Sequence, residues 1–316
     1  MSYRVASLLP SATEIVCAVG AGAELVGISH ECDFPESVRH LPALTRARLR
    51  PARTSGEIDR AVRSVLQDAL AVYEIELARL EQARPDVIVT QDLCDVCAVS
   101  FNDVCAATAA LVGQEIRIVN LHPTRLDDIW SDIRRVADAV GRTAEGGEVV
   151  RALEARTGAI ARRGSTGAER PRVVTIEWLD PVMLGGMWMP ELIERAGGVP
   201  LVTRPGQHAP TLTKEALLAL TPDVVLIKPC GFPLERTLEE LSILKTALPW
   251  ESWHAIREGR VYVADGNAYF NRPGPRIVES LEILAACLRP EAFADVRLKH
   301  RDSVIRLDAD LKTYSF

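Results

Sequence analysis

The chain has 316 residues, 47% of them hydrophobic and 25% charged, a composition typical of a folded protein long enough for two domains. With 37 basic and 43 acidic side chains its formal net charge is −6, which argues against binding to nucleic acid through a basic surface. Because no run of about 18 apolar residues occurs, the sequence predicts no insertion into a membrane.

The opening residues, MSYRVASLLPSATEIV, show no charged leader, long apolar stretch or small-residue cleavage site, so no signal peptide is visible. The seven cysteines are an odd number in a long chain, which favours a reducing compartment over a disulfide framework. We therefore expect a cytoplasmic protein, or a periplasmic or extracellular one if a leader has been removed.

The first expected elements are a strand, a loop and a helix. Residues 4–9 form an apolar run typical of a buried strand. Ser11 and Glu14 have the spacing of a capping box, in which each side chain accepts a hydrogen bond from the other residue's backbone N–H. The helix that follows is expected to end at Gly20 and Gly22.

The next elements alternate between strands and helices. Residues 25–29 read as a strand, and apolar positions spaced 3.6 residues apart predict an amphipathic helix from Glu57 to Tyr73. A short helix ending at Arg84 precedes a buried parallel strand over residues 85–90.

Part of this pattern recurs in the second half of the chain. The sequence ARPDVIV at residues 83–89 is echoed by LTPDVVL at residues 220–226, and the opening unit is echoed by residues 172–198. This loose repeat predicts two α/β lobes. The segment between them, residues 126–163, is mostly helical in pattern and predicts a helix that connects the lobes. The expected domains are an N-terminal lobe (1–142), the connecting helix (143–164) and a C-terminal lobe (165–316).

Ligands of open parallel α/β sheets bind beyond the carboxyl ends of the strands. The loops expected at those ends are residues 10–14, 30–33, 91–100, 177–188, 229–232 and 265–276. The last loop contains Asn267, Tyr269, Phe270, Arg272 and Arg276, which can stack on a planar ligand and hold carboxylate or amide arms. A rigid loop whose arginines cap neighbouring carbonyl groups is the alternative.

A second group of candidate ligand contacts is apolar. Trp178, Met183 and Trp188 follow a predicted strand, together with two further methionines. They can face a flat apolar ligand, or they can be ordinary core.

Cysteine and histidine residues suggest a possible metal or redox site. Cys94 and Cys97 have CxxC spacing, which suits zinc or dithiol chemistry, and His30 and Cys32 can supply two further ligands. Small buried thiols are the alternative for the CxxC pair. For His30 and Cys32 the alternatives are a nucleophile–base pair and structural hydrogen bonding.

The chain resembles the iron-siderophore/vitamin B12 substrate-binding protein family, and its cobalamin-binding branch most closely. The segments that carry the resemblance, in chain order, are SLLPSATEI, GISHECDFP, LARLEQARPDVIV, WLDPVMLGG, LTKEALLALTPDVVLI and YFNRPGPR. The resemblance implies a class III periplasmic-binding-protein-like α/β fold of two Rossmann-like lobes joined by a single long helix. It also implies a non-enzymatic protein that binds a cobalamin-like corrinoid or another metal chelate in a cleft between the lobes.

The resemblance further implies roles for particular residues. The expected ligand-binding residues are His30, Glu31, Trp178, Met183, Trp188, Asn267, Tyr269, Phe270, Arg272 and Arg276. Glu31, Met183 and Ala209 stand where aromatic residues line the corrin ring in the family. Glu215 resembles the C-lobe glutamate that docks on an ABC permease. The corresponding N-lobe position is Ala78, with Glu74 and Glu76 as nearby substitutes.

Two other functions stay open. One is a cytoplasmic metal-binding or redox protein that holds zinc or iron with Cys94, Cys97, Cys32 and His30. The other is an interaction module that keeps the fold but has lost its ligand.

Overall fold

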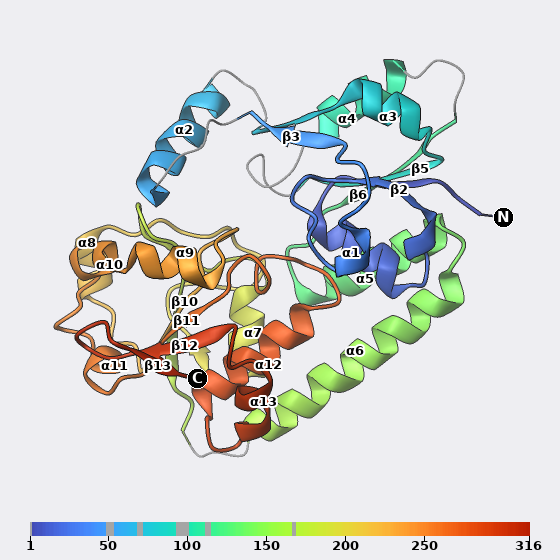
Figure 1. Ribbon diagram of the computed structural model, residues 1–316. Coiled ribbons are helices and arrows are strands. Elements are labelled where there is room, and N and C mark those ends of the chain that lie inside the picture. Colours follow the sequence, from blue (N-terminus) through green and yellow to red (C-terminus); the bar gives the residue numbers. More distant parts are fainter. Residues whose placement is uncertain (1, 49–53, 68–71, 93–100, 111–114, 166–168) are drawn as a thin grey trace. The chain divides into compact units, whose positions relative to one another are not determined.

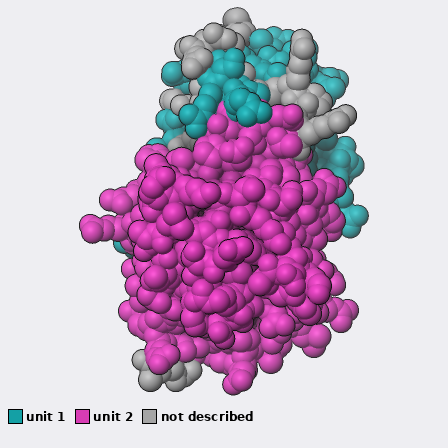
Figure 2. Space-filling view, turned by 90° about the vertical axis from the view of Figure 1, so that its left-hand side faces the viewer, with its two compact units in different colours: residues 1–53, 60–153 teal, residues 54–59, 154–316 magenta. Residues whose placement is uncertain are grey.

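The computed structural model describes residues 2–48, 54–67, 72–92, 101–110, 115–165 and 169–316 (Figure 1). The chain divides into unit 1, which comprises Met1–Arg53 and Arg60–Leu153, and unit 2, which comprises Thr54–Asp59 and Glu154–Phe316 (Figure 2). The second division falls within the long helix α6 (Thr143–Gly164). The contiguous boundaries expected from the sequence, 1–142, 143–164 and 165–316, stay a prediction.

Unit 1 is built on a parallel sheet with the strand order β2-β1-β5-β6. Its strands are β1 (Val5–Ser7), β2 (Leu25–Ile28), β5 (Val87–Gln91) and β6 (Arg117–Leu121). Its main helices are α1 (Pro10–Ala18), α3 (Leu77–Ala83), α4 (Phe101–Ala110) and α5 (Leu126–Ala139). A separate antiparallel pair is formed by β3 (Thr45–Ala47) and β4 (Tyr73–Ile75).

The two faces of this sheet are covered by different helices. Ala6 and Ile88 pack in one core cluster with Leu80 of α3 and Val104 of α4. Helices α1 and α5 contact each other and lie on the other side of the sheet in Figure 1. Because both faces are buried, the strands are nearly continuous apolar runs, as expected for a parallel sheet.

Unit 2 contains a mixed sheet with the order β13-β12-β11-β10-β7-β8, with β9 beside the start of β7. Its parallel centre consists of β7 (Arg172–Trp178), β10 (Val224–Ile227) and β11 (Val261–Ala264). The flanking strands are β8 (Met183–Leu184), β9 (Val199–Pro200), β12 (Val304–Leu307) and β13 (Thr313–Ser315). The helices are α7 (Met189–Arg195), α8 (Lys214–Leu218), α9 (Leu234–Glu239), α10 (Leu241–Ala247), α11 (His254–Arg257), α12 (Ile277–Leu288) and α13 (Ala294–Lys299).

The sequence repeat has a structural counterpart at the start of the central strands. In unit 1 the carboxylate of Asp86 accepts a hydrogen bond from the backbone N–H of Arg4 at 2.8 Å. In unit 2 Asp223 accepts the same bond from Arg172 at 2.7 Å. Each aspartate follows the proline of the repeated phrase, so the phrase joins two neighbouring parallel strands in both units.

Two local predictions from the sequence are wrong. Helix α1 begins at Pro10, and its N-cap is Leu9 with no side-chain hydrogen bond, so Ser11 and Glu14 do not form a capping box. Proline at the first helical position has no N–H to satisfy, which lets the helix begin one residue before the predicted cap. Helix α2 (Ser55–Gln67) ends before Tyr73, which instead opens β4.

Candidate functional site

Three loops of unit 2 meet beyond the carboxyl ends of β7, β10 and β11. The N–H of Cys230 donates to the Glu177 carbonyl at 3.0 Å, and the N–H of Gly266 donates to the Phe232 carbonyl at 2.9 Å. A Cβ atom on Gly266 would lie 2.0 Å from the Pro229 carbonyl oxygen, so only glycine allows this approach. These loops form the carboxyl-edge site, the term used below for this part of unit 2.

A buried lysine lies at the centre of the carboxyl-edge site. Lys228 directly follows β10, and its side chain is 0% exposed. Its Nζ donates to Glu177 Oε2 at 2.6 Å and to Asn271 Oδ1 at 2.9 Å. Buried ammonium groups persist only when paired in this way, because desolvation of an isolated charge is costly.

Sequence reasoning missed Lys228 and Asn271 as members of the site. Asn271 Nδ2 also donates to the carbonyl of Lys228 at 3.3 Å, which ties the last loop to the end of β10, and to the carbonyl of Gly266 within the loop at 2.8 Å. The available signal was the phrase VVLIK, in which a lysine directly follows a strand that is apolar throughout. Lysine is almost never fully buried unless it is paired.

The loop 265–276 is held in a strained conformation by neighbouring elements. Phe270 has φ = 68°, in the left-handed region that bulky residues rarely adopt. Its N–H donates to Ser280 Oγ of α12 at 2.8 Å, and its carbonyl accepts from Trp188 Nε1 at 2.8 Å. The Phe270 and Trp188 side chains are 1% and 7% exposed, so they support the loop from within.

The polar residues of this loop bind one another. Arg272 is 6% exposed and donates to Asn267 Oδ1 at 3.0 Å. Asp265 Oδ1 accepts from the backbone N–H groups of Asn267 and Ala268 at 2.9 and 2.7 Å. Burial raises the pKa of Asp265, although these two hydrogen bonds oppose the rise. Arg272 and Asn267, two predicted ligand residues, therefore brace the loop in this structure.

Tyr269 and Arg276, also predicted ligand residues, lie against each other. The Arg276 guanidinium stands 4.7 Å from the centre of the Tyr269 ring, and its Nε lies 3.4 Å from Glu279 Oε2. Tyr269 also packs edge to face on His300, with 5.6 Å between the ring centres. The pair thus connects the loop to α12 and to the end of α13.

Trp178 and Met183 are both half-buried on the β7 side of the carboxyl-edge site. Trp178 packs edge to face on Phe232 at 5.2 Å, and its Nε1 donates to the Asp180 carbonyl at 3.1 Å. Met183 belongs to β8, which pairs with the end of β7. Of the predicted apolar contacts, these two keep exposed surface, whereas Trp188 and Phe270 are buried.

In unit 1, His30, Glu31 and Cys32 follow β2 but make different contacts. His30 Nδ1 lies 2.8 Å from Thr45 Oγ1, its ring packs edge to face on Tyr73 at 4.9 Å, and Nε2 is 3.3 Å from Glu31 Oε1. Cys32 is buried, with Sγ 3.1 Å from Thr13 Oγ1. The structure thus directs His30 and Cys32 toward hydroxyl groups.

Two of the four predicted metal ligands, Cys94 and Cys97, lie outside the described residues, so the structure does not test their role. Within the described ranges no group of three or more His, Cys, Asp or Glu side chains is arranged to hold a metal ion. The zinc or iron site therefore stays a prediction.

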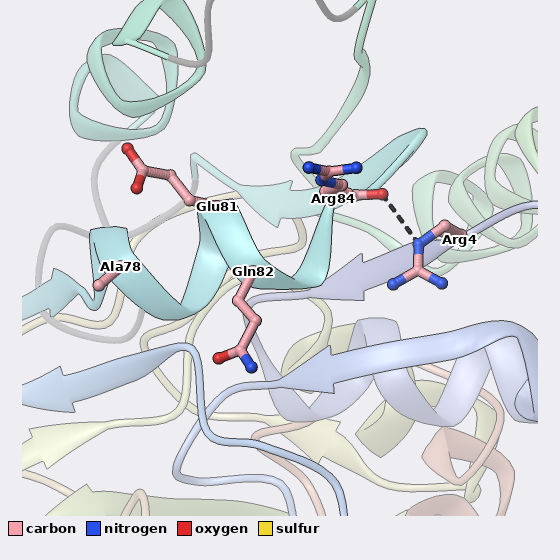
Figure 3. A pocket seen from close by; sticks show the side chains of 5 residues that line it. All are labelled: Arg4, Ala78, Glu81, Gln82 and Arg84. Atoms are coloured by element: carbon pink, nitrogen blue, oxygen red, sulfur yellow. Dashed lines mark hydrogen bonds between the residues drawn. The ribbon is translucent and has the colours of Figure 1, made fainter.

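Helix α3 and the start of β1 border a concavity on unit 1, lined by Arg4, Ala78, Glu81, Gln82 and Arg84 (Figure 3). Arg4 closes one side of it, because its guanidinium donates to the carbonyls of Ala83 and Arg84 at the end of α3. Ala78 is the position that the family resemblance aligns with permease docking. The nearby Glu74 and Glu76 are both ion-paired with Arg46.

Glu215, the predicted docking residue of unit 2, lies exposed in the first turn of α8. Its backbone and the Thr213 side chain donate hydrogen bonds that lower the pKa of Glu215, so the carboxylate is ionised at neutral pH.

Comparison with known proteins gives the family. The family model described as "Periplasmic binding protein" matches residues 5–268. An uncharacterized ABC transporter substrate-binding lipoprotein, YvrC of Bacillus subtilis (strain 168), is 20% identical over 92% of this chain and 82% of its own length.

Solved structures share the fold. A periplasmic heme-binding protein from Pseudomonas aeruginosa has a TM-score of 0.69 and 20% identity, covering 92% of this chain and 94% of its own. The periplasmic vitamin B12-binding protein BtuF of Vibrio cholerae has a TM-score of 0.64 and 18% identity, covering 91% and 97%. These matches confirm the predicted class III two-lobed α/β fold, but they do not single out the cobalamin branch.

The comparisons and the structure also bear on the expected location, on membrane insertion and on the expectation of a non-enzymatic protein. The names of these relatives, periplasmic or lipoprotein, give no support to a cytoplasmic location. In the part of the chain that the structure describes, no helix is long and apolar enough to cross a bilayer. The expectation of a non-enzymatic protein is confirmed, since the matched family consists of substrate-binding proteins. The chain therefore belongs to the periplasmic binding protein family.

Proposed function

We propose that the chain is the substrate-binding component of an ABC transporter and that its ligand is a cobalamin-like corrinoid. The observation that carries the proposal is the carboxyl-edge site, where half-buried Trp178 and Met183 lie beside a loop held rigid around Phe270. A flat macrocycle needs such an apolar surface, with polar groups around it for its arms.

The strain at Phe270 supports a binding role for the loop. A non-glycine residue at φ = 68° costs on the order of 1–3 kcal/mol and persists only where the surroundings impose it. The hydrogen bonds from Trp188 and to Ser280 impose it here. A loop fixed before the ligand arrives loses little conformational entropy on binding, which favours affinity.

The relatives support the ligand class. The Vibrio cholerae structure is of a vitamin B12-binding protein and the Pseudomonas aeruginosa structure is of a heme-binding protein, so both have metal-bearing macrocycles as ligands. We choose the corrinoid because the segments SLLPSATEI to YFNRPGPR resemble the cobalamin-binding branch. Binding of a zinc or iron ion in place of a corrinoid is an alternative outcome of the mass-spectrometry test described next.

Native mass spectrometry of the purified chain, with and without hydroxocobalamin, tests the proposal. A one-to-one corrinoid adduct is the expected result. An apo mass in both samples would contradict it, and a zinc- or iron-sized mass without corrinoid would move the function to the cysteine site. A parallel sample with hemin shows whether the protein binds heme or the corrinoid.

We further propose that Glu215 contacts the permease. It is exposed and ionised on α8, so it can pair with a permease cation. Charge reversal by Glu215→Lys should abolish ligand-dependent stimulation of the transporter ATPase while leaving corrinoid binding unchanged. Glu258→Lys, at the exposed C-cap of α11, is the matched control.

A further inference from the structure

The Lys228–Glu177 pair presents one side of a carboxylate to the carboxyl-edge site. Glu177 Oε2 binds the buried Lys228 Nζ at 2.6 Å, and the Glu177 side chain is 26% exposed. Among the residues that the structure describes, Oε1 of Glu177 has no hydrogen-bond partner. The carboxylate is therefore fixed by one oxygen, while the other can accept a hydrogen bond from a ligand.

Lys228 has the geometry of a positioning residue. It is 0% exposed, so a ligand cannot reach its ammonium group, and its second bond, to Asn271 Oδ1 at 2.9 Å, continues to the last loop. The pair thus orients the Glu177 carboxylate relative to the loop.

The arginines of the last loop are engaged within the protein. Arg272 is 6% exposed and bound to Asn267, and Arg276 stacks on Tyr269 and faces Glu279. A ligand carboxylate at this site would therefore face the Glu177 carboxylate, while both arginines of the loop already pair with groups of the protein. The Glu177 carboxylate would repel a ligand carboxylate placed beside it, whereas it would accept a hydrogen bond from a ligand amide N–H.

We propose that Glu177 is a specificity-determining residue that accepts a hydrogen bond from an amide N–H of the ligand, with Lys228 as its positioning residue. The site therefore selects a macrocycle whose rim carries amides over one whose rim carries carboxylates. This inference rests on the proposed function and names the chemistry of the ligand's arms.

Two probes with the same corrin ring isolate this effect. Dicyanocobinamide carries amides on its rim, and cobyrinic acid carries carboxylates. Isothermal titration of wild-type protein should give the smaller Kd for the amide probe. Glu177→Gln removes the negative charge and adds a donor, so it should reduce this preference roughly tenfold, the equivalent of about 1.4 kcal/mol. The matched control is Glu258→Gln, which changes the net charge equally at the exposed C-cap of α11 and should leave the preference unchanged.

The substitution leaves Lys228 buried without a counter-charge, which can destabilise the fold. The double variant Glu177→Gln/Lys228→Met removes both charges at similar volume, and it should show the same reduced preference. A wild-type preference for the carboxylate probe, or an unchanged preference in the double variant, would overturn the inference while the proposed function stands. Failure of wild-type protein to bind either probe would overturn both.

Discussion

Trp188 Nε1 donates to the carbonyl oxygen of Phe270 at 2.8 Å and so joins two residues that are 82 positions apart in the sequence. The bond connects the turn before α7 to the strained point of the loop 265–276. Because this hydrogen bond fixes the backbone at Phe270, it indirectly supports the binding of any ligand that contacts the loop.

Replacing Trp188 with phenylalanine should therefore weaken ligand binding through the loop. The variant loses one buried hydrogen bond and some packing, and we expect a loss of about 1–3 kcal/mol in the free energy of unfolding. Urea denaturation measures the stability and calorimetry measures corrinoid affinity. Trp253→Phe is the control, since Trp253 is also buried and its Nε1 donates to the Leu217 carbonyl at 3.1 Å in the core. It should lose similar stability with unchanged affinity, and equal affinity loss in both variants would refute the indirect role.

Arg276→Ala should lower corrinoid affinity by roughly tenfold, with a small loss of stability. The guanidinium above Tyr269 contributes on the order of 0.5–1 kcal/mol, and its removal frees the ring to move. Thermal unfolding and calorimetry together test this. In the control Arg297→Ala, which removes a guanidinium 5.7 Å from the Phe316 ring, affinity should not change. A large drop in melting temperature for Arg276→Ala would mark the residue as structural.

Glu282 should stabilise the fold at neutral pH and cease to do so in acid. Burial alone would raise its pKa, but His300, whose Nε2 lies 3.5 Å from Oε2, and the hydrogen bonds from Arg156 and Lys299 outweigh burial and lower the pKa to about 2. A carboxyl group with a lowered pKa contributes stability above its unfolded value, near 4.5, and loses it as pH falls toward 2. Glu282→Gln should cost on the order of 2–3 kcal/mol at pH 7 and flatten the acid limb of the stability curve. An unchanged acid limb, measured by urea titration from pH 7 to 2, would contradict this.

Asp132 should have the opposite effect. Burial raises its pKa to about 6, although Arg135 opposes the rise. An acid with a raised pKa favours the folded state below about pH 4 and weakens it as pH rises through 6. Asp132→Asn should therefore increase the free energy of unfolding by on the order of 2–3 kcal/mol at pH 7.5, with the difference disappearing at pH 4. The exposed Asp127→Asn on the same helix should give no such gain, and a loss of stability in Asp132→Asn would refute the argument.

The sequence predicted the elements better than the contacts between them. The repeated Pro-Asp-Val phrase located β5 and β10 because burial on both faces of a parallel sheet imposes continuous apolar runs. The start of α1 was misplaced because a proline at the first helical position and a capping box are alternative ways to begin a helix.

The members of the carboxyl-edge site were recognised only in part, for a related reason. Tyr269, Phe270 and Arg272 stood out because aromatic and basic residues cluster there in the sequence. Lys228 did not, since its role depends on Glu177, 51 residues earlier, and on Asn271, 43 residues later. Partners at such separations follow from strand order rather than from any local spacing.

The assignment of Thr54–Asp59 to unit 2 limits how the protein can be dissected. The N–H of Ser55, at the start of α2, donates to both carboxylate oxygens of Glu240, at 3.1 and 2.9 Å, and both residues are buried. A fragment that begins after α6 lacks Ser55, so its Glu240 carboxylate would be left without these donors. Recombinant half-proteins cut at a single point therefore do not correspond to the natural modules, and chimeras with other family members need to exchange the segment 54–59 together with the second half.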